Sequence, residues 1–302
     1  MTFVVDVEAV LGNMVLEVGD ETLEVDHGHC AKVATIRRGI GTRIVPPRAG
    51  HGSLPVVTAD DVLAVLHEAA DAVVDAFTES IDWGPSGLKT GQYASDLVAD
   101  AAVLAVLGRA GLRVLSEESG LGPGDGPVAV VDPLDGSTNA SLDLPWFATS
   151  LCVVDDEGPW VAVVHNHGNG ERYDAIRGGG ARRDGAALPD RSNDPAGPGT
   201  TAVNGVPSHE IGWFRCMGAA ALDLCAVADG RFRGYVDFHG GLGVWDYAGA
   251  LLICREVGIE VVDAEGRDLV VLDHAARRAP VAGPPALLDE LLGLRKSAGP
   301  AH

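Results

Sequence analysis

The chain has 302 residues, of which 46% are hydrophobic and 22% charged, a composition typical of a folded globular protein that excludes wholesale disorder. Its 43 acidic residues outnumber its 22 basic ones, and a net charge of −21 repels nucleic acid and anionic membrane surfaces. No apolar run approaches the roughly 20 residues of a membrane-spanning helix, and the N-terminus lacks the pattern of a signal peptide. We therefore expect a soluble, cytoplasmic protein that binds neither nucleic acid nor membranes.

Residues 1–57 differ in character from the rest of the chain. Apolar and polar residues alternate here, which predicts short strands or hairpins, and the segment ends in a linker rich in Pro and Gly. His27, His29 and Cys30 follow no standard metal-site spacing and are predicted to form a surface turn. We expect an N-terminal β-rich extension that is dispensable for catalysis. The alternative is an upstream translation start, with the natural start nearer Val57.

From residue 58 onward the pattern mixes helices and strands. Asp60 or Asp61 is expected to cap a helix that continues to Phe77, and the run over 96–108 predicts a second helix. Short apolar runs further along predict buried strands. The strands are expected at 113–115, 128–131, 148–154, 160–164, 235–238, 260–262 and 269–272, and the later helices at 219–228, 245–256 and 284–294.

This order of elements predicts a layered α/β architecture in two halves. The stretch 178–199 is rich in Gly, Pro, Asp and Asn and is predicted to connect them. Residues 58–195 would form an N-terminal α+β half with the metal and phosphate motifs, and residues 196–302 a C-terminal α/β half that completes the site. The five cysteines include no C-x-x-C pair and are expected to stay reduced.

The central acidic motif runs from Asp132 to Asn139 and directly follows an apolar run. Two carboxylates, Asp132 and Asp135, are three residues apart, and the Pro between them fixes φ and donates no N–H. In a tight turn they converge on one point. Gly136, Ser137 and Thr138 follow at a predicted helix N-terminus, where N–H groups and hydroxyls favour phosphate. Taken alone, such a motif is more often a turn with solvated carboxylates.

Two further acidic positions change that balance. Glu117 and Glu118 lie at the end of a predicted strand, and Asp246 lies in the first turn of a predicted helix. Each is ordinary by itself, as a solvated loop or as a favourable charge at a helix start. Four carboxylates at three element ends, however, form a set that suits Mg²⁺ or a similar hard cation.

These motifs resemble those of the inositol monophosphatase family. Residues 132–139 are similar to its D-P-[IL]-D-G-[TS]-x-N signature, residues 117–118 to its G-E-E element, and residues 245–249 to its W-D-x-A-G signature. The resemblance covers roughly residues 58–294. It implies an α-β-α-β-α sandwich of the inositol monophosphatase/fructose bisphosphatase type, a lithium-sensitive Mg²⁺-dependent phosphatase and a homodimer.

The resemblance also implies the metal ligands. Glu117, Asp132 and the carbonyl of Leu134 would hold one Mg²⁺, and Asp132, Asp135 and Asp246 would hold a second. A looser third ion would share Glu117. One cation lowers the pKa of its bound water, and the other stabilises the departing alkoxide.

Further roles follow from the same resemblance, with some departures from the family pattern. Thr138 would pair with an upstream Asp to help deprotonate the attacking water, and Asp100 is the predicted partner, although the usual V-T-x-A-D stretch has lost its Thr. Glu117 is included in the catalytic set. The phosphate contacts would be Gly136, Ser137 and Thr138; the substrate contacts would be Asp135, Ala219 and Asp237; Lys89 would be the basic residue of a mobile loop, or else a solvated lysine.

Three functions remain open at this point. The first is Mg²⁺-dependent hydrolysis of a small polyol or sugar phosphate, with inositol 1-phosphate as the default substrate. The second keeps the chemistry but acts on histidinol phosphate, fructose 1,6-bisphosphate or a nucleotide 3'-phosphate, because the motifs recognise metal and phosphate and not the alcohol. The third is a non-catalytic regulatory binding protein on the same scaffold, against which the complete set of carboxylates argues.

Overall fold

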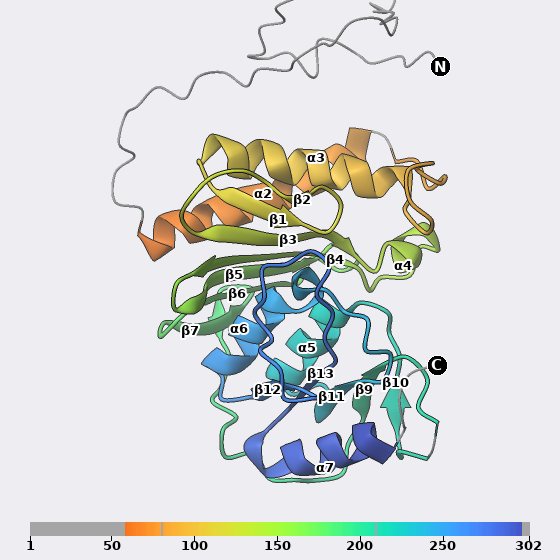
Figure 1. The fold of residues 1–302 in the computed structure, drawn as a ribbon. Helices are drawn as coiled ribbons and strands as arrows, with labels where there is room; N and C mark the ends of the chain where they lie inside the picture. The colour runs from red at the N-terminus through yellow and green to blue at the C-terminus, as the bar shows by residue number, and fades with distance from the viewer. Residues whose placement is uncertain (1–57, 80, 209, 298–302) are drawn as a thin grey trace, which may run out of the picture. The chain divides into compact units, whose positions relative to one another are not determined.

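The computed structural model describes residues 58–79, 81–208 and 210–297, and the chain divides into two compact units, residues 1–56 and 57–302. The predicted N-terminal strands and the turn at His27 lie outside the described residues. The second unit stacks helices and sheets in the order α-β-α-β-α (Figure 1). The predicted α/β fold class is thereby confirmed.

The first layer consists of the helices α2 (Ala59–Glu79) and α3 (Ala94–Arg109). The cap of α2 differs from the expected one, because Thr58 and not Asp60 or Asp61 precedes the helix. Thr58 Oγ1 accepts the N–H of Asp61 at 3.2 Å, and Asp61 Oδ2 accepts the N–H of Thr58 at 3.0 Å. This reciprocal pair is a capping box, with Asp61 in the role of the third helical residue.

The larger sheet forms the second layer and has eight strands in the order β2-β1-β3-β4-β5-β6-β7-β8. β1 and β3 are parallel, and all other neighbours are antiparallel. β7 and β8 lie in the stretch that the sequence predicts to be a connection. Their Gly, Ala and Arg residues do not show the alternation of apolar and polar residues that indicates a strand. The strands are β1 (Arg113–Ser116), β2 (Gly120–Leu121), β3 (Val128–Asp135), β4 (Ala148–Asp155), β5 (Gly158–Asn166), β6 (Arg172–Ile176), β7 (Gly180–Arg183) and β8 (Ala186–Ala187).

The remaining layers belong to the C-terminal part of the unit. Helices α5 (Ala220–Ala228) and α6 (Ala248–Glu256) lie between the two sheets, and α7 (Pro285–Ser297) covers the outer face of the smaller sheet (Figure 1). That sheet has the order β10-β9-β11-β13-β12. Its strands are β9 (Thr201–Asn204), β10 (Phe214–Arg215), β11 (Gly234–Asp237), β12 (Glu260–Asp263) and β13 (Pro280–Gly283).

The strand predicted at 269–272 does not form. Those residues belong to a loop over 268–279, and the last strand of the smaller sheet is β13. Leu269 is buried and its carbonyl accepts the Tyr247 hydroxyl at 2.7 Å, so its apolar character serves the core without strand pairing. Strand β13 contains a Pro and a Gly, both disfavoured in strands, and it was not predicted for that reason.

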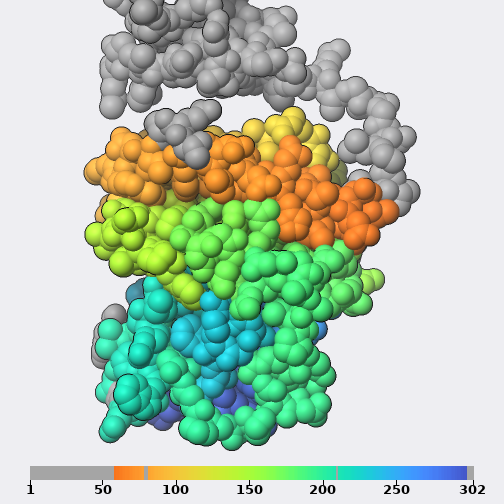
Figure 2. Space-filling view, turned by 180° about the vertical axis from the view of Figure 1, so that it is seen from behind, coloured from red at the N-terminus to blue at the C-terminus, as the bar shows by residue number. Residues whose placement is uncertain are grey.

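Three hydrophobic cores hold the layers together. One lies between the sheets around α5 and α6, one between α2, α3 and the larger sheet, and one between the smaller sheet and α7. The view from behind shows α2 at one end of the unit and the C-terminal layers at the other (Figure 2). The four described cysteines form no disulfide. Within residues 58–297, apart from 80 and 209, no helix is long and apolar enough to span a membrane.

Candidate active site

Asp132 and Asp135 lie at the end of β3, which continues four residues beyond the predicted strand. In a regular strand, residues three apart point to opposite faces of the sheet. Here Asp132 pairs with Ser150 and Asp135 with Ala148, so three steps along β3 oppose two steps along β4. The extra residue forms a β-bulge between Asp132 and Asp135, and the missing N–H of Pro133 is tolerated in such an irregular stretch. The bulge returns both carboxylates to the same side of the sheet.

Gly136 turns the chain from β3 into the short helix α4 (Ser137–Ser141). Its φ is 82°, in the left-handed region, and a Cβ there would lie 3.0 Å from the carbonyl oxygen of Trp146 and 3.1 Å from the Cβ of Ala219. Ala219 is therefore buried behind this turn, 1% exposed, and does not line the pocket as a substrate contact would. This corrects the expectation for Ala219.

Asp135 is fixed from the other side by α5. Its Oδ2 accepts the N–H of Ala221 at 2.8 Å, and the backbone of Ala220 also hydrogen-bonds to it. These bonds use the unpaired N–H groups at the start of the helix. Asp135 is thus held between a strand of the larger sheet and a helix of the middle layer.

Glu117 and Asp246 complete the cluster from two further elements. Glu117 directly follows β1, and its N–H donates to the carbonyl of Val131 on β3 at 3.1 Å. Asp246 ends a 3-10 helix, η1 (Val244–Asp246), and its Oδ2 accepts the N–H of Gly243 at 2.6 Å. One carboxylate oxygen from each of Glu117, Asp132 and Asp246 lies within 4.8 Å of the others.

Burial and mutual repulsion determine the protonation of this cluster. The pKa of Glu117 and that of Asp135 are each raised to about 7, and those of Asp132 and Asp246 are raised well above the ordinary value. Burial is the largest cause for all four, and the negative charges of neighbouring carboxylates add to it. Within the described part of the chain, none of the four forms an ion pair with Lys, Arg or His. Converging, uncompensated oxygen ligands are the donor set that a divalent cation requires, so the residues fit a metal site.

A pocket of about 330 Å³ reaches the cluster at Glu117, the one of the four carboxylates that lines it. It is lined by residues of the α3 side, of the larger sheet and of the 268–279 loop, among them Lys89, Asp96, Leu134, Ser137, Trp245 and Arg277. Lys89 lines the pocket, but its ammonium group already has partners. Its Nζ donates to the carbonyl of Glu118 at 2.9 Å and lies 3.4 Å from the Glu118 carboxylate. Leu134, whose carbonyl the resemblance implies as a metal ligand, also lines the pocket.

The structure does not bring the expected pair Asp100 and Thr138 together. Asp100 accepts a hydrogen bond from Ser116 Oγ at 2.5 Å, whereas the Thr138 hydroxyl forms a hydrogen bond with the Tyr93 side chain. Of the two carboxylates on α3, the one that lines the pocket is Asp96, one helical turn before Asp100.

Asp96 instead lies beside Ser137. Its Oδ2 accepts the N–H of Tyr93 at 2.8 Å, whereas Oδ1 is buried without a hydrogen-bond partner among the described residues. Burial raises the pKa of Asp96 to about 6, against the lowering effects of the Tyr93 N–H and, more weakly, the Ser137 hydroxyl. The acid and hydroxyl that face the pocket are therefore Asp96 and Ser137, which corrects the prediction.

Asp237 is also placed differently from the expectation. It is fully buried at the end of β11, and its oxygens accept the N–H groups of His239 at 2.8 Å and Gly240 at 2.9 Å. Asn204 Nδ2 adds a third bond at 3.1 Å. These bonds hold the Asp237 carboxylate in the turn after β11, and Asp237 is not among the residues that line the pocket.

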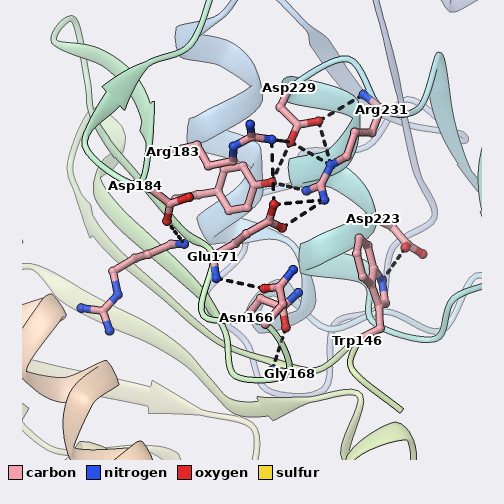
Figure 3. A network of polar contacts seen from close by, with 12 residues as sticks. Trp146, Asn166, Gly168, Glu171, Arg183, Asp184, Asp223, Asp229 and Arg231 are labelled. Atoms are coloured by element: carbon pink, nitrogen blue, oxygen red, sulfur yellow. Dashed lines mark hydrogen bonds and ion pairs between the residues drawn. The ribbon is translucent and has the colours of Figure 1, made fainter.

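A second polar network lies outside the pocket and shows the contrast with the cluster (Figure 3). Asp229, 1% exposed, accepts bonds from Arg183 at 2.8 Å, Arg231 at 2.9 Å and the Tyr173 hydroxyl at 2.7 Å. Every charge there has a partner, so the network ties α5 to the larger sheet. The four carboxylates of the cluster have no such ion-pair partner among the described residues.

Known proteins share both the sequence and the fold. Residues 89–298 match the inositol monophosphatase family. A relative from Archaeoglobus fulgidus, named fructose-1,6-bisphosphatase/inositol-1-monophosphatase, is 31% identical over 225 residues, 69% of this chain and 87% of the relative. Nus factor SuhB of Escherichia coli is 33% identical over 257 residues, 78% of this chain and 90% of the relative.

Solved structures agree with this assignment. The extragenic suppressor protein suhB from Bartonella henselae aligns with a TM-score of 0.66 and 26% identity, over 78% of this chain and 98% of that chain. The chain therefore belongs to the inositol monophosphatase family.

Proposed function

We propose that this chain is a Mg²⁺-dependent phosphatase that hydrolyses a small phosphate monoester of a polyol or sugar, with inositol 1-phosphate as the reference substrate. The observation that carries the proposal is the convergence of Glu117, Asp132 and Asp246 without an ion-pair partner among the described residues, with Glu117 also lining a pocket. Asp135 and the Leu134 carbonyl complete the proposed ligand set. Bound Mg²⁺ would neutralise the phosphate charge and supply an activated water.

Asp96 is the residue we assign to the proton of that water. A general base works best when its pKa lies near the working pH, and burial raises the pKa of Asp96 to about 6. Its Oδ1 has no hydrogen-bond partner among the described residues, so this atom is available to accept the proton. The Ser137 hydroxyl, beside it in the pocket, would orient the water.

The test is phosphate release measured with and without Mg²⁺ and with a chelator. The panel would contain inositol 1-phosphate, fructose 1,6-bisphosphate, histidinol phosphate and a nucleotide 3'-phosphate. We expect turnover that requires Mg²⁺ and is inhibited by Li⁺ at millimolar concentration. Turnover that persists in the chelator would contradict the metal assignment.

Two matched variants test the assignment of the base. Asp96→Asn is expected to lower kcat by about 10²- to 10⁴-fold, the usual contribution of a general base. Asp100→Asn is the control, one helical turn away and equally buried, and we expect it to keep most of the activity because Asp100 contacts Ser116. Equal losses in both variants would refute the choice of Asp96.

The second candidate function is regulatory binding. It is favoured by the name Nus factor, which several relatives carry, including the Escherichia coli protein described above. A folded wild-type chain that releases phosphate from no ester of the panel at saturating Mg²⁺ would favour this alternative. The homodimer implied by the family resemblance stays a prediction, and sedimentation velocity would test it.

A further inference from the structure

The 268–279 loop closes one side of the pocket. His274 Nε2 lies 2.9 Å from the carbonyl oxygen of Glu117, and its ring centroid lies 4.7 Å from that of Trp245. The loop therefore spans from the end of β1 to the residue just before Asp246. Its residues His274 and Arg277 line the pocket together with Trp245.

Arg277 is the cation of this loop that is least committed to protein partners. Its guanidinium carbon lies 5.2 Å from the centroid of the Trp245 ring, and Nη1 donates to the carbonyls of His274 and Ala276 at 2.8 and 2.9 Å. Among the described residues, Nε and Nη2 have no hydrogen-bond partner, and no carboxylate lies within 4.0 Å of the group. Lys89, the other cation of the pocket, is occupied by Glu118.

The stacking on Trp245 determines what Arg277 can bind. A guanidinium that lies on an aromatic ring is held in its plane, and its N–H groups point outward along the edge. That edge matches two oxygens of a phosphate or a carboxylate. In a chain of net charge −21, such a group is a local exception to the surrounding field.

Arg277 comes from a different part of the chain than the pocket residues assigned to the attacking water. Asp96 and Ser137 belong to α3 and α4, whereas Arg277 belongs to the 268–279 loop. The charge of Arg277 also opposes the rise in the pKa of Asp246, so it is near enough to act on an anion bound at this site. We propose that Arg277 binds a second oxyanion, carried by the alcohol portion of the substrate. The preferred substrate is then a phosphate monoester with an additional phosphate or carboxylate. This inference rests on the proposed phosphatase function.

Two pairs of substrates isolate the second oxyanion. Fructose 1,6-bisphosphate differs from fructose 1-phosphate by one phosphate, and 3-phosphoglycerate differs from glycerol 3-phosphate by a carboxylate in place of a hydroxymethyl group. The readout is the ratio of kcat/KM within each pair. We expect the wild-type ratio to favour the doubly anionic member by about 10- to 100-fold, the range for a charge-assisted hydrogen bond. The two pairs distinguish a phosphate from a carboxylate as the bound group.

Variants of the loop then identify the residue responsible. Arg277→Gln should reduce the ratio by about tenfold or more, and Arg277→Lys should restore only part of it, because an ammonium cannot form the two parallel bonds. The matched control is Arg278→Gln. Arg278 carries the same charge one residue later, but its Nε donates to the carbonyl of Asp268 at 2.6 Å, and it does not line the pocket.

The outcomes separate this inference from the proposed function. A wild-type ratio near one within both pairs, with clear phosphate release, would refute the role of Arg277 and leave the phosphatase proposal intact. An equal fall of the ratio in the Arg278 control would also refute it. No release from any of these esters would overturn both. A ratio that falls only in the Arg277 variants, with unchanged thermal midpoints, would support the second oxyanion site.

Discussion

Asp135→Asn should abolish turnover and yet stabilise the protein when no metal is bound. Asp135 is buried, and its pKa is raised from 3.8 to about 7, chiefly by burial. A carboxyl with a raised folded-state pKa binds a proton more tightly in the folded protein, so its ionisation destabilises the fold as the pH rises from about 4 to about 7. At pH 8 the full penalty is about 4 kcal/mol, at about 1.4 kcal/mol for each unit of pKa.

Part of this penalty should be recovered in the variant. The amide removes the charge, but it accepts a weaker hydrogen bond from the Ala221 N–H than the carboxylate does, so we expect a net gain of about 2 kcal/mol. For a unit of this size, that corresponds to a rise in the thermal midpoint of about 4 to 8 °C. At pH 5 the gain should fall by more than half, because the wild-type carboxyl is then largely protonated in the folded state.

The assay is thermal unfolding in a chelator at pH 8 and pH 5. Asp263→Asn is the control, since Asp263 is also buried, but bonds from Arg267 at 2.7 Å and from the Ala279 N–H outweigh the effect of burial and lower its pKa. That variant should melt lower than the wild type at both pH values. An Asp135→Asn protein that melts at or below the wild type at pH 8 would refute the view that ionisation of this buried carboxyl destabilises the metal-free fold.

The other predictions concern the metal, the buried histidines, the turn and the extension. Mg²⁺ at 100 times its Kd should add about 2.7 kcal/mol to the free energy of unfolding of the wild type and so raise its thermal midpoint; an unchanged midpoint would contradict a metal site. Burial lowers the pKa of His167 to about 3, so folding stability should fall as the pH decreases below 6.5. In urea unfolding between pH 6 and 4, the midpoint of His167→Gln should fall less steeply than that of the wild type. An identical dependence on pH would exclude His167 as the source of the fall. Gly136→Ala should lower both stability, by about 1–3 kcal/mol, and phosphate release, because its Cβ would lie 3.0 Å from the Trp146 carbonyl at a φ of 82°; wild-type values of both would show that the turn tolerates a side chain. A chain that starts at Val57 should hydrolyse the same ester with similar kcat/KM, and loss of turnover would make the extension part of the site.

The sequence was most informative where local order determines geometry. The layered fold and the four-carboxylate cluster could be predicted because, in the sequence, each acid lies close after a clear apolar run or in the first turn of a clear helical pattern. Asp96 and Asp100 could not be separated in this way. They are four residues apart on α3, on the same face of the helix, and only the packing of α3 determines which one reaches the pocket.

Apolar patterns did not predict the strands correctly where residues are buried in the core without strand pairing. Leu269 and its neighbours have the composition of a strand but contribute buried side chains from a loop. Pro280–Gly283 has the composition of a turn but pairs with two neighbouring strands. Tertiary contacts override local preference in both segments, and they depend on residues distant in the chain.

The bulge in β3 also limits how this gene can change over evolution. The bulge places one extra residue of β3 between Asp132 and Asp135, so the spacing of the two acids and the irregular pairing depend on each other. Loss of one codon there would remove the bulge and leave the acids two apart in a regular strand, still on one face, whereas one added codon beside a retained bulge would turn the second carboxylate to the face that packs against α2 and α3. A spacing of three residues should therefore persist only in relatives that keep the bulge.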